Sequence, residues 1–442
     1  MTFKSIMVIG FDSDFVSILK NKNIIPKLWI KPGVHKIFEE KEGVLCINHE
    51  YFFYDYFKKV KKVAPIEYVH IIRKELYIQF EINNDRKFSC SWQRKSWESN
   101  VHKFHLFINM YYDLLKEKSI DCIIFSEYPH SGSKIILYKL AKLMGIETII
   151  TYSAGMLRGK YIIIKDMDDI GRFETAKIKG KQIFVDTKKI ERPKYVELGI
   201  KGVFKKNDGK INIYINIIKN LKKYISFYIK GDEEKKKRSI QRICRGFDRI
   251  KFLKIANKKY EDVNDIIGDF IVFPLHVQPE ATGETLGEPF SDQLSAIEHL
   301  RNVLPENVKI IIKENMNQTI YARGEFFYKR IESMNNVFYV SHEIDIYKLI
   351  KKSVAVATLL GTAGWEALCM GKPVICYARA WYRNFPGVFM WNEFSFFDIK
   401  NFEFNRSSLE KAVIDHSSLY LENVNDTEGV VDNIIKYMEM LK

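Results

Sequence analysis

The chain has 442 residues, 46% of them hydrophobic, so it is a globular protein too long to be organised around one hydrophobic core. It contains no run of the roughly 18 uncharged apolar residues that a membrane-spanning helix needs. Its N-terminus, MTFKSIMVIGFDSD, reaches acidic residues too early for a secretion signal, so we expect a cytoplasmic protein. The six cysteines are scattered without a C-x-x-C pair, which indicates neither a disulfide framework nor a zinc site.

The net charge of +15 is concentrated in one segment. Residues 201–260 contain 19 Lys and Arg against 5 Asp and Glu, a net charge of +14, so the rest of the chain is nearly neutral. Lysines are interleaved there with Ile, Tyr and Phe in INIYINIIKNLKKYISFYIK. This pattern is typical of a solvated helical connector and also of a helix that lies on an anionic membrane surface, and both readings stay open. No nucleic-acid-binding motif accompanies the basic segment, so we expect no nucleic-acid partner.

Strand and helix patterns alternate through the first part of the chain. Residues 5–10, SIMVIG, predict a first parallel strand, and Asp12 behind it is more typical of a helix cap than of a D-x-D metal clamp. A second unit is clearer, with a strand at 121–125, the loop SEYPHSG, a helix at 134–144 and a strand at 147–151. This alternation predicts a Rossmann-type domain.

Two polar residues stand in the loop after the strand at 121–125. Parallel sheets bind ligands at the carboxyl ends of their strands, so this rule places Glu127 and His130 at the edge where a crevice forms. A carboxylate and an imidazole three residues apart suit general acid–base catalysis on a hydroxyl group. The same pair can equally cap the helix that follows.

The same alternation returns after the basic segment. A strand at 269–273 leads into a long loop that carries His276, Gln278, Glu280 and Thr282, and a strand at 308–313 ends in Lys313, Glu314 and Asn315. Further strands are predicted at 337–340 and 354–359. Residues 290–293 open a helix that runs to about 303, and further helices are predicted at 321–334 and 345–351, with a final amphipathic helix at 429–442. This order predicts a second doubly wound domain.

The stretch after the strand at 354–359 is the strongest candidate for a binding site. Residues 361–364, Gly-Thr-Ala-Gly, form a turn of small residues before a helix that we expect to begin near Trp365. The first amides of a helix have no partner within it, and its dipole is positive there, so a phosphate can approach the backbone. We expect Glu366 in the first turn, where it can accept hydrogen bonds from sugar hydroxyls. The alternative is an ordinary tight turn, because GTAG is neither a GxGxxG nor a P-loop fingerprint.

Six motifs, in this order along the chain, resemble the bacterial capsule polysaccharide biosynthesis family. They are FPLHVQPEAT at 273–282, FSDQ at 290–293, KEN at 313–315, GTAGWEAL at 361–368, GKPV at 371–374 and AWYRNFPGVF at 380–389. The resemblance is strong over about residues 265–392, weaker over 121–170 and absent over 200–265. Members of this family resemble GT-B glycosyltransferases and include the Kdo transferases that build the linker between a lipid anchor and a capsule chain.

The chain departs from the family pattern at one position. Where relatives usually show Lys-Glu-His-Pro, a pair that resembles the nucleotide-phosphate site of CMP-sugar enzymes, this chain has Lys313, Glu314, Asn315 and Met316. Asparagine can donate a neutral hydrogen bond to a phosphate, but it supplies neither a proton nor a positive charge. CMP-Kdo or another CMP-nonulosonic acid therefore competes with a UDP- or GDP-sugar as the expected donor.

The resemblance implies a GT-B-like α/β fold, in which two doubly wound Rossmann-type domains face a cleft and a basic helical connector is inserted. We expect an acceptor domain at 1–195, the connector at 196–265 and a donor domain at 266–425. A C-terminal helix at 426–442 is expected to pack back across the first domain.

The resemblance further implies a glycosyltransferase of capsular or related surface polysaccharides, with a nucleotide sugar as substrate, a glycan or lipid-linked glycan as acceptor, and neither cofactor nor metal. Backbone amides at 361–364 would take the phosphates, Glu366 the hydroxyls, and Lys313 with Arg379 the charge on the leaving group. Glu127 or His130 would act as base, with Glu280 as the alternative carboxylate. The full set of expected donor-binding residues is His276, Gln278, Thr282, Lys313, Glu314, Asn315, Gly361, Thr362, Ala363, Gly364, Glu366 and Arg379.

Two rival functions fit the same motifs. A GT-B-fold nucleotide-sugar epimerase would need no acceptor and no basic surface. A non-catalytic partner in capsule assembly or export would keep the fold and have no affinity for nucleotides.

Overall fold

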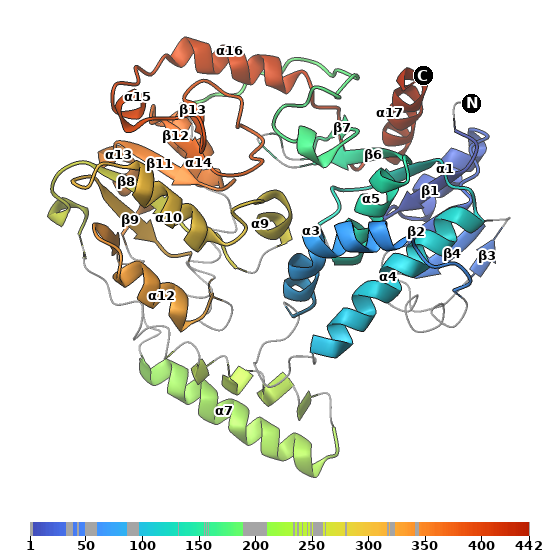
Figure 1. Cartoon of the computed structure of the whole chain (residues 1–442), viewed down its shortest axis with the longest axis horizontal. Coiled ribbons are helices and arrows are strands. Elements are labelled where there is room, and N and C mark those ends of the chain that lie inside the picture. Colours follow the sequence, from blue (N-terminus) through green and yellow to red (C-terminus); the bar gives the residue numbers. More distant parts are fainter. Residues whose placement is uncertain are drawn as a thin grey trace. The chain divides into compact units, whose positions relative to one another are not determined.

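The chain folds into two compact units (Figure 1). Unit 1 consists of Met1–Asn84, Lys95–Val185 and Ser408–Lys442, and unit 2 consists of Asp85–Arg94 and Asp186–Ser407. The computed structural model of the chain describes residues 3–31, 39–41, 44–48, 60–85, 97–130, 132–153, 155, 157, 159–188, 210–232, 235–236, 238–240, 242–244, 246–247, 250, 260, 262–278, 281–315, 318, 323–340 and 344–441.

The C-terminal part of the chain that belongs to unit 1 is longer than the expected segment 426–442. The division between the units falls inside helix α16 (Arg406–Ser417), so the expected donor-domain boundary at 425 lies beyond it. The reason is that the last turn of α16 packs on unit 1, where the ring of His416 lies 5.2 Å from that of Phe173. The basic segment is grouped with unit 2 and does not form a unit of its own.

The sheet of unit 1 has the strand order β3-β4-β2-β1-β5-β6-β7. Its inner strands run parallel, and the edge strands β3 and β7 are antiparallel to their neighbours. The central strands β1 and β5, IMVI and CIIF, are wholly buried, as expected of parallel strands covered on both faces. The bounds are β1 (Ile6–Ile9), β2 (Leu28–Lys31), β3 (Glu39–Lys41), β4 (Val44–Asn48), β5 (Cys122–Phe125), β6 (Glu147–Tyr152) and β7 (Ile162–Ile164).

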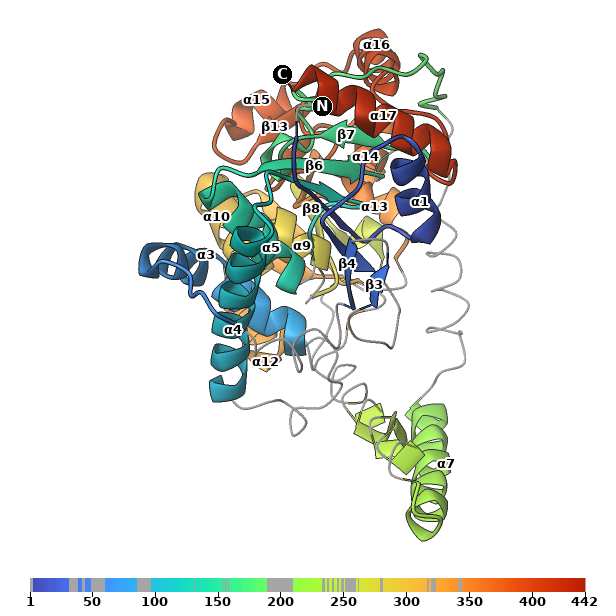
Figure 2. The same cartoon turned by 90° about the vertical axis from the view of Figure 1, so that its right-hand side faces the viewer.

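The helices of unit 1 start where the sequence supplies a cap or an apolar stripe. Asp12 is the N-cap of α1 and accepts a hydrogen bond from the amide of Phe15 at 3.1 Å, which confirms the cap prediction. Helix α1 and the C-terminal helix α17 lie side by side (Figure 2), and Val431 and Ile434 of α17 belong to the same core as Leu19 of α1. The bounds are α1 (Ser13–Asn21), α3 (Ile66–Asp85), α4 (Trp97–Glu117), α5 (Gly132–Leu143), 3-10 helix η3 (Met167–Asp169) and α17 (Thr427–Met440).

The sheet of unit 2 is parallel throughout, with the order β10-β9-β8-β11-β12-β13. Counted from the first strand of the unit this is the Rossmann order 3-2-1-4-5-6, so the prediction of a doubly wound domain is confirmed. The strands are β8 (Phe270–Pro274), β9 (Lys309–Lys313), β10 (Val337–Tyr339), β11 (Ala355–Thr358), β12 (Val374–Cys376) and β13 (Val388–Met390). The helices are α7 (Lys210–Ile229), η4 (Val263–Asp265), α9 (Ala281–Leu286), α10 (Gln293–Val303), α12 (Glu325–Glu332), α13 (Ile346–Lys352), α14 (Thr362–Cys369) and α15 (Phe396–Lys400).

Each sheet has one point where the chain reverses its direction of winding. In unit 2 this switch point lies between the neighbouring strands β8 and β11, and in unit 1 between β1 and β5. Open parallel sheets bind ligands at the carboxyl ends of the strands beside such a point. Ligand-binding sites are therefore expected in the loops after β8 and β11 of unit 2 and in the loops after β1 and β5 of unit 1. No helix among the described residues is long and apolar enough to cross a membrane.

A glycine makes room for the returning C-terminal segment in unit 1. A Cβ on Gly180 would lie 2.0 Å from the backbone carbonyl oxygen of Tyr420, and the amide of Gly180 donates to the carbonyl of Ser418 at 2.7 Å. We predict that Gly180→Ala lowers the free energy of unfolding by about 1–3 kcal/mol, because a backbone atom cannot rotate out of the way. Gly283→Ala is the matched control, since a Cβ there meets nothing within 4 Å and lies in helix α9.

Urea unfolding of both variants measures the difference. Alanine at 283 is expected to change stability by less than about 1 kcal/mol, in the favourable direction, because alanine is the better helix former. Equal stability of the two variants would mean that Gly180 does not pack against the backbone of Tyr420 as described.

Candidate functional site

His276 ties together the two strand ends at the switch point of unit 2. Its Nε2 lies 3.2 Å from Oγ1 of Thr358, the last residue of β11, and the amide of Leu360 donates to the same nitrogen at 3.5 Å. The amide of Gly361 donates to Thr358 Oγ1 at 3.4 Å, which turns the hydroxyl hydrogen toward the imidazole. The imidazole is therefore an acceptor at Nε2 and carries its proton on Nδ1.

The neutral state of His276 has a clear physical cause. Burial, with a smaller contribution from the Arg323 guanidinium, lowers the pKa of His276 to about 4. A second proton on the imidazole would also make Nε2 a donor, which would then face the amide of Leu360, itself a donor. His276 thus acts as a fixed acceptor that holds the turn between β11 and α14.

Helix α14 begins at Thr362 rather than near Trp365, so the predicted helix start was three residues late. The small residues 361–364 allow this, because their side chains leave room for the helix to start directly after the strand. Glu366 consequently lies in the second turn, not in the first as expected, and only 7% of it is exposed. No acidic residue stands in the first turn, and Gly361 offers no side-chain cap to the first amides.

The amides of the Gly-Thr-Ala-Gly turn are not equivalent. The amide of Gly364 donates to the carbonyl of Gly361 at 3.1 Å, and the same carbonyl accepts from the Tyr382 hydroxyl at 2.5 Å. A Cβ on Gly364 would lie 2.2 Å from that hydroxyl oxygen, so this glycine is required by close packing. The amides of Thr362 and Ala363 belong to the first turn and have no acceptor within the helix, and the Thr362 side chain is exposed. They are the groups of this turn that can receive an anion.

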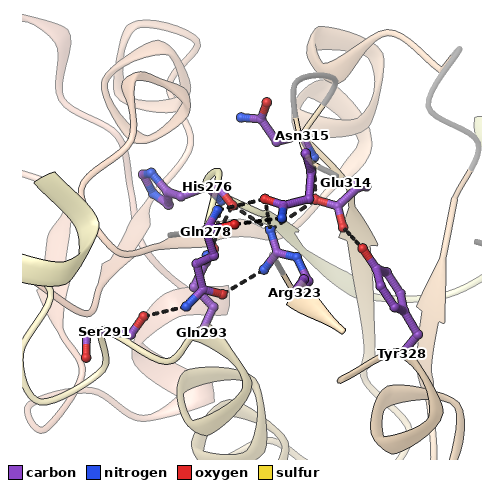
Figure 3. Close-up of polar contacts among 9 residues, drawn as sticks. His276, Gln278, Ser291, Gln293, Glu314, Asn315, Arg323 and Tyr328 are labelled. Atoms are coloured by element: carbon purple, nitrogen blue, oxygen red, sulfur yellow. Dashed lines mark hydrogen bonds and ion pairs between the residues drawn. The ribbon is translucent and has the colours of Figure 1, made fainter. Parts of the chain in front are cut away.

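A buried ion pair lies behind His276 (Figure 3). Nη2 of Arg323 is 3.1 Å from Oε1 of Glu314, and the side chains of the two residues are 1% and 6% exposed. The Tyr328 hydroxyl donates to the second oxygen of Glu314 at 2.8 Å, and the guanidinium stacks on the ring of Phe327 at 4.7 Å. Both charges are therefore compensated, which a buried pair needs in order not to destabilise the fold.

Three glutamines complete this network and fix the loop after β8. Arg323 donates to the side-chain oxygen of Gln278 at 2.8 Å, to that of Gln318 at 3.1 Å and to the carbonyl of His276 at 2.6 Å. Gln318 and Gln278 exchange hydrogen bonds of 2.7 and 2.8 Å between side chain and backbone. Gln293 does the same with the backbone of His276, at 2.7 and 3.1 Å. The loop that carries His276 is thus held on both sides.

Two expected donor-binding residues contribute backbone contacts at this edge. The carbonyl of Lys313, the last residue of β9, accepts from the amide of Leu275 at 2.9 Å. The amide of Arg379, after β12, donates at 3.1 Å to the carbonyl of Leu286 at the end of α9.

The other expected residues of this edge fall into two groups. The amide of Asn315 donates to Glu314 Oε1 at 2.7 Å, and its side chain points away from Arg323 (Figure 3). Thr282 lies in α9, and its side chain is outside the described residues, as is the whole of Glu280.

The candidate base lies at the switch point of unit 1. Nδ1 of His130 is 3.0 Å from the carbonyl oxygen of Tyr128, a contact in which the nitrogen can only donate. In the neutral imidazole this leaves Nε2 free of its proton and able to accept one. Glu127 Oε2 lies 3.9 Å from the same Nδ1, and Glu127 Oε1 accepts from Lys134 Nζ of α5 at 2.7 Å.

The loops after β1 and β5 meet beside this group. Gly10 has φ +86°, and a Cβ there would lie 2.1 Å from Oγ of Ser126, which precedes Glu127. Among the residues that the structure describes, no group of three or more His, Cys, Asp and Glu side chains is arranged to hold a metal ion.

Several residues of these sites were not expected from the sequence. Arg323 and Gln318 were missed because a charged or polar residue beside a loop is usually solvated, although both lie within nine residues of their partner Glu314 or of each other. Gln293 was noted only as part of the FSDQ motif. Thr358 was counted only as the end of a strand, and Tyr382 only as part of a motif. A local signal existed for Lys134, which stands one helical turn into α5 and seven residues after its partner Glu127.

Two Rossmann-type domains in one chain, each with polar groups at its switch point, define a protein of the GT-B-like class. The chain belongs to the capsule polysaccharide biosynthesis protein family, whose model matches residues 145–413. This confirms the resemblance drawn from the motifs. No curated protein matches the chain.

The chain also matches solved structures at low similarity. KpsC of Thermosulfurimonas dismutans, described as a beta Kdo 2,7 transferase, has 13% sequence identity and a TM-score of 0.31 over 78% of this chain and 97% of its own. A beta Kdo 2,4 transferase KpsC structure from the same organism has 11% identity and a TM-score of 0.29 over 72% and 88%. The UDP-GlcNAc 2-epimerase of Methanocaldococcus jannaschii has 12% identity and a TM-score of 0.24 over 98% and 99%. The family assignment rests on the sequence match.

The buried ion pair can be tested against a surface pair formed by Arg330 of the following helix, α12. We predict that Arg323→Met lowers the free energy of unfolding by about 3–5 kcal/mol, because Glu314 is left buried without a compensating charge. Arg330→Met is the matched control, since Arg330 forms a 2.6 Å pair with Glu298 in which both side chains are over a third exposed.

The control is expected to cost less than about 1 kcal/mol. Denaturant unfolding of both variants gives the comparison. Similar losses would show that Arg323 is solvated in solution and that the loop after β8 has another support.

Proposed function

We propose that the protein is a glycosyltransferase of bacterial capsular or related surface polysaccharides. Its donor is a nucleotide sugar held by unit 2, and its acceptor is a glycan or a lipid-linked glycan held by unit 1. The observation that carries the proposal is the open first turn of α14 at the switch point, free of acidic residues and braced by His276. We place the reaction in the cytoplasm, where nucleotide sugars are available.

The donor phosphates are assigned to the amides of Thr362 and Ala363. These amides sit at the positive end of the helix dipole, and a turn of small residues lets a phosphate come close. Lys313 is the last residue of β9, and Arg379 follows β12 at the same edge of the sheet. We assign both to the charge that develops on the leaving nucleotide. Preorganised donors of this kind are worth about 10²- to 10³-fold in rate each.

The nucleobase of the nucleotide-sugar donor belongs to one of two classes. Asn315 carries no charge, and the carboxylate of Glu314 is committed to Arg323 and Tyr328. A CMP-linked nonulosonic acid such as CMP-Kdo would thus be recognised without the imidazole that relatives place here. A UDP- or GDP-sugar fits a neutral amide equally well.

We assign the base that activates the acceptor hydroxyl to His130. Its Nδ1 is engaged by the Tyr128 carbonyl, so Nε2 is the atom that takes the proton. Glu127, 3.9 Å from Nδ1 and paired with Lys134, is the group that stabilises the imidazolium once it forms. No step needs a cofactor or a metal ion.

The phosphate assignment is tested by placing a charge at the first helical position. Wild-type protein is screened by thermal shift against CMP, UDP, GDP and their sugar conjugates, and the matching ligand at 100 times its Kd adds about 2.7 kcal/mol of stability. Thr362→Asp is expected to weaken that ligand at least about tenfold, because the carboxylate repels the phosphate and occupies the amides. The fold is preserved, since an acid in the first turn favours the helix.

Thr362→Asn has nearly the same shape without the charge and should bind almost as the wild type does. Equal affinity of the Asp and Asn variants would remove the phosphates from α14. If no nucleotide stabilises the wild type, the protein is a non-catalytic assembly partner. Conversion of a UDP-sugar to its epimer without acceptor would identify an epimerase.

The acceptor side is tested by isosteric removal of the base. We predict that His130→Gln lowers kcat by about 10²- to 10⁴-fold, while Glu127→Gln lowers it by about tenfold, because Glu127 acts only through His130. Unchanged melting temperatures and an unchanged Kd for the nucleotide would confine the loss to the chemical step. His70→Gln, an exposed histidine of the same unit, is the control. A larger loss for Glu127→Gln than for His130→Gln would make the carboxylate the base.

A further inference from the structure

Helix α7 of the basic segment has one packed side. Ile213 and Ile217 are buried against Ile250, with Ile243 beside them. A Cβ on Gly246 would lie 2.4 Å from Cγ1 of Ile217, so the second part of the segment lies directly on α7 (Figure 2). One side of α7 is therefore covered by the chain itself.

A second side of α7 is apolar and exposed. Tyr214, Ile218, Leu221, Ile225 and Tyr228 follow one another at spacings of four, three, four and three residues, which puts them on one stripe of the helix. Ile215 and Ile229 widen this stripe, and the seven side chains are between 41% and 78% exposed. Scattered apolar residues are normal on a surface, but a continuous stripe of this kind marks an interaction site.

All the charged side chains of α7 are positive. The helix carries Lys210, Lys219, Lys222 and Lys223, Lys230 follows it, and no acidic residue occurs between 210 and 231. Lys219, Lys223 and Lys230 lie on the helix wheel beyond the stripe, on the side away from the buried isoleucines, and Lys222 borders the stripe. The partner must therefore offer an apolar surface and negative charge side by side.

We propose that α7 lies in the interface of an anionic lipid bilayer, with the stripe of Tyr214, Ile218, Leu221, Ile225 and Tyr228 in the acyl region and the lysines among the headgroups. Lipid combines both chemistries, since acyl chains take the aliphatic side chains and anionic headgroups take the ammonium groups. A second copy of α7 offers the lysines no acid to pair with. The phosphates of a nucleic acid could pair with the lysines, but a nucleic acid offers no apolar surface to cover the exposed isoleucines. The protein thus binds the membrane surface without spanning it.

If the protein binds the membrane surface, its acceptor is a glycan on a lipid anchor. This statement about the acceptor rests on the proposed transferase function. Binding to vesicles needs neither donor nor acceptor. A failure of the vesicle test therefore leaves the transferase proposal intact, and a failure of the nucleotide screen leaves the membrane proposal intact.

The test is co-sedimentation of the full chain with vesicles of phosphatidylcholine alone and of phosphatidylcholine mixed with phosphatidylglycerol. We expect binding to the anionic vesicles that falls with rising salt. Ile218→Ser, Leu221→Ser and Ile225→Ser combined should lower partitioning at least about tenfold. Lys219→Gln, Lys222→Gln and Lys223→Gln combined should lower it by about fivefold per lysine on anionic vesicles only.

Matched controls carry the same changes elsewhere. Val63→Ser, Ile267→Ser and Phe326→Ser replace three apolar side chains that are 69%, 78% and 75% exposed, and Lys179→Gln, Lys351→Gln and Lys411→Gln remove three exposed lysines. Both control sets should bind vesicles as the wild type does. The proposal is overturned if the stripe variant binds as well as the wild type, or if the wild type ignores anionic lipid. It is also overturned if the wild type is a dimer that the stripe variant converts to a monomer, because a second copy then covers the stripe.

Discussion

The guanidinium of Arg323 is a charge without access to water, and the arrangement of the unit 2 site follows from that constraint. Removing such a group from water costs several kcal/mol, which is recovered through the acceptors that surround its two terminal nitrogens. Only its Nε has no hydrogen-bond partner among the described residues. The acceptors come from Glu314, Gln318, Gln278 and the carbonyl of His276, in the loops after β9 and β8. A shift of either loop would leave part of the charge unpaired, so both loops are held in one position.

His276 transmits this order to the turn before α14. Its backbone is fixed by Arg323 and Gln293, and its ring accepts from the Leu360 amide and lies against Thr358. An imidazole with a pKa near its usual value would gain and lose a proton around neutral pH and would loosen the turn each time. Because burial lowers the pKa of His276 to about 4, the turn keeps the same hydrogen bonds over the physiological range. The hydrogen bonds of His276 and Arg323 thus preorganise the site.

What the sequence predicts well is local. Asp12 stands directly before the helix that it caps, and the helix expected to open at 290–293 begins at Gln293 and ends at Val303, as expected. The doubly wound class of unit 2 follows from the alternation of buried strands with helices, whereas the strand order is seen only in the structure. The start of α14 was misplaced because Thr and Gly are poor helix formers, whereas the close packing of Gly364 against the Tyr382 hydroxyl favours a helix that begins at Thr362.

The remaining features depend on contacts that no pattern in the sequence indicates. Arg323 and Glu314 are only nine residues apart, but no periodicity shows that they pair in the interior. No pattern in residues 408–425 shows that they belong to unit 1. The contact of Gly180 with Tyr420 joins segments that no local pattern connects. Periodicity reports which face of an element is buried, but it does not report the partner that buries it.

The two switch points have similar backbone geometry but differ in the charges that surround them. In unit 1, Gly10 abuts the hydroxyl of Ser126, and in unit 2, Gly361 lies against that of Thr358. The turn after β1 leads into a helix whose first amides are capped by Asp12 and followed by Asp14, a combination that repels a phosphate. The turn after β11 has neither cap nor acid. One fold used twice thus gives one edge suited to an anion and another, with His130 and Glu127, suited to a hydroxyl group that must lose its proton. That asymmetry is what a transferase with a phosphorylated donor and a neutral nucleophile requires.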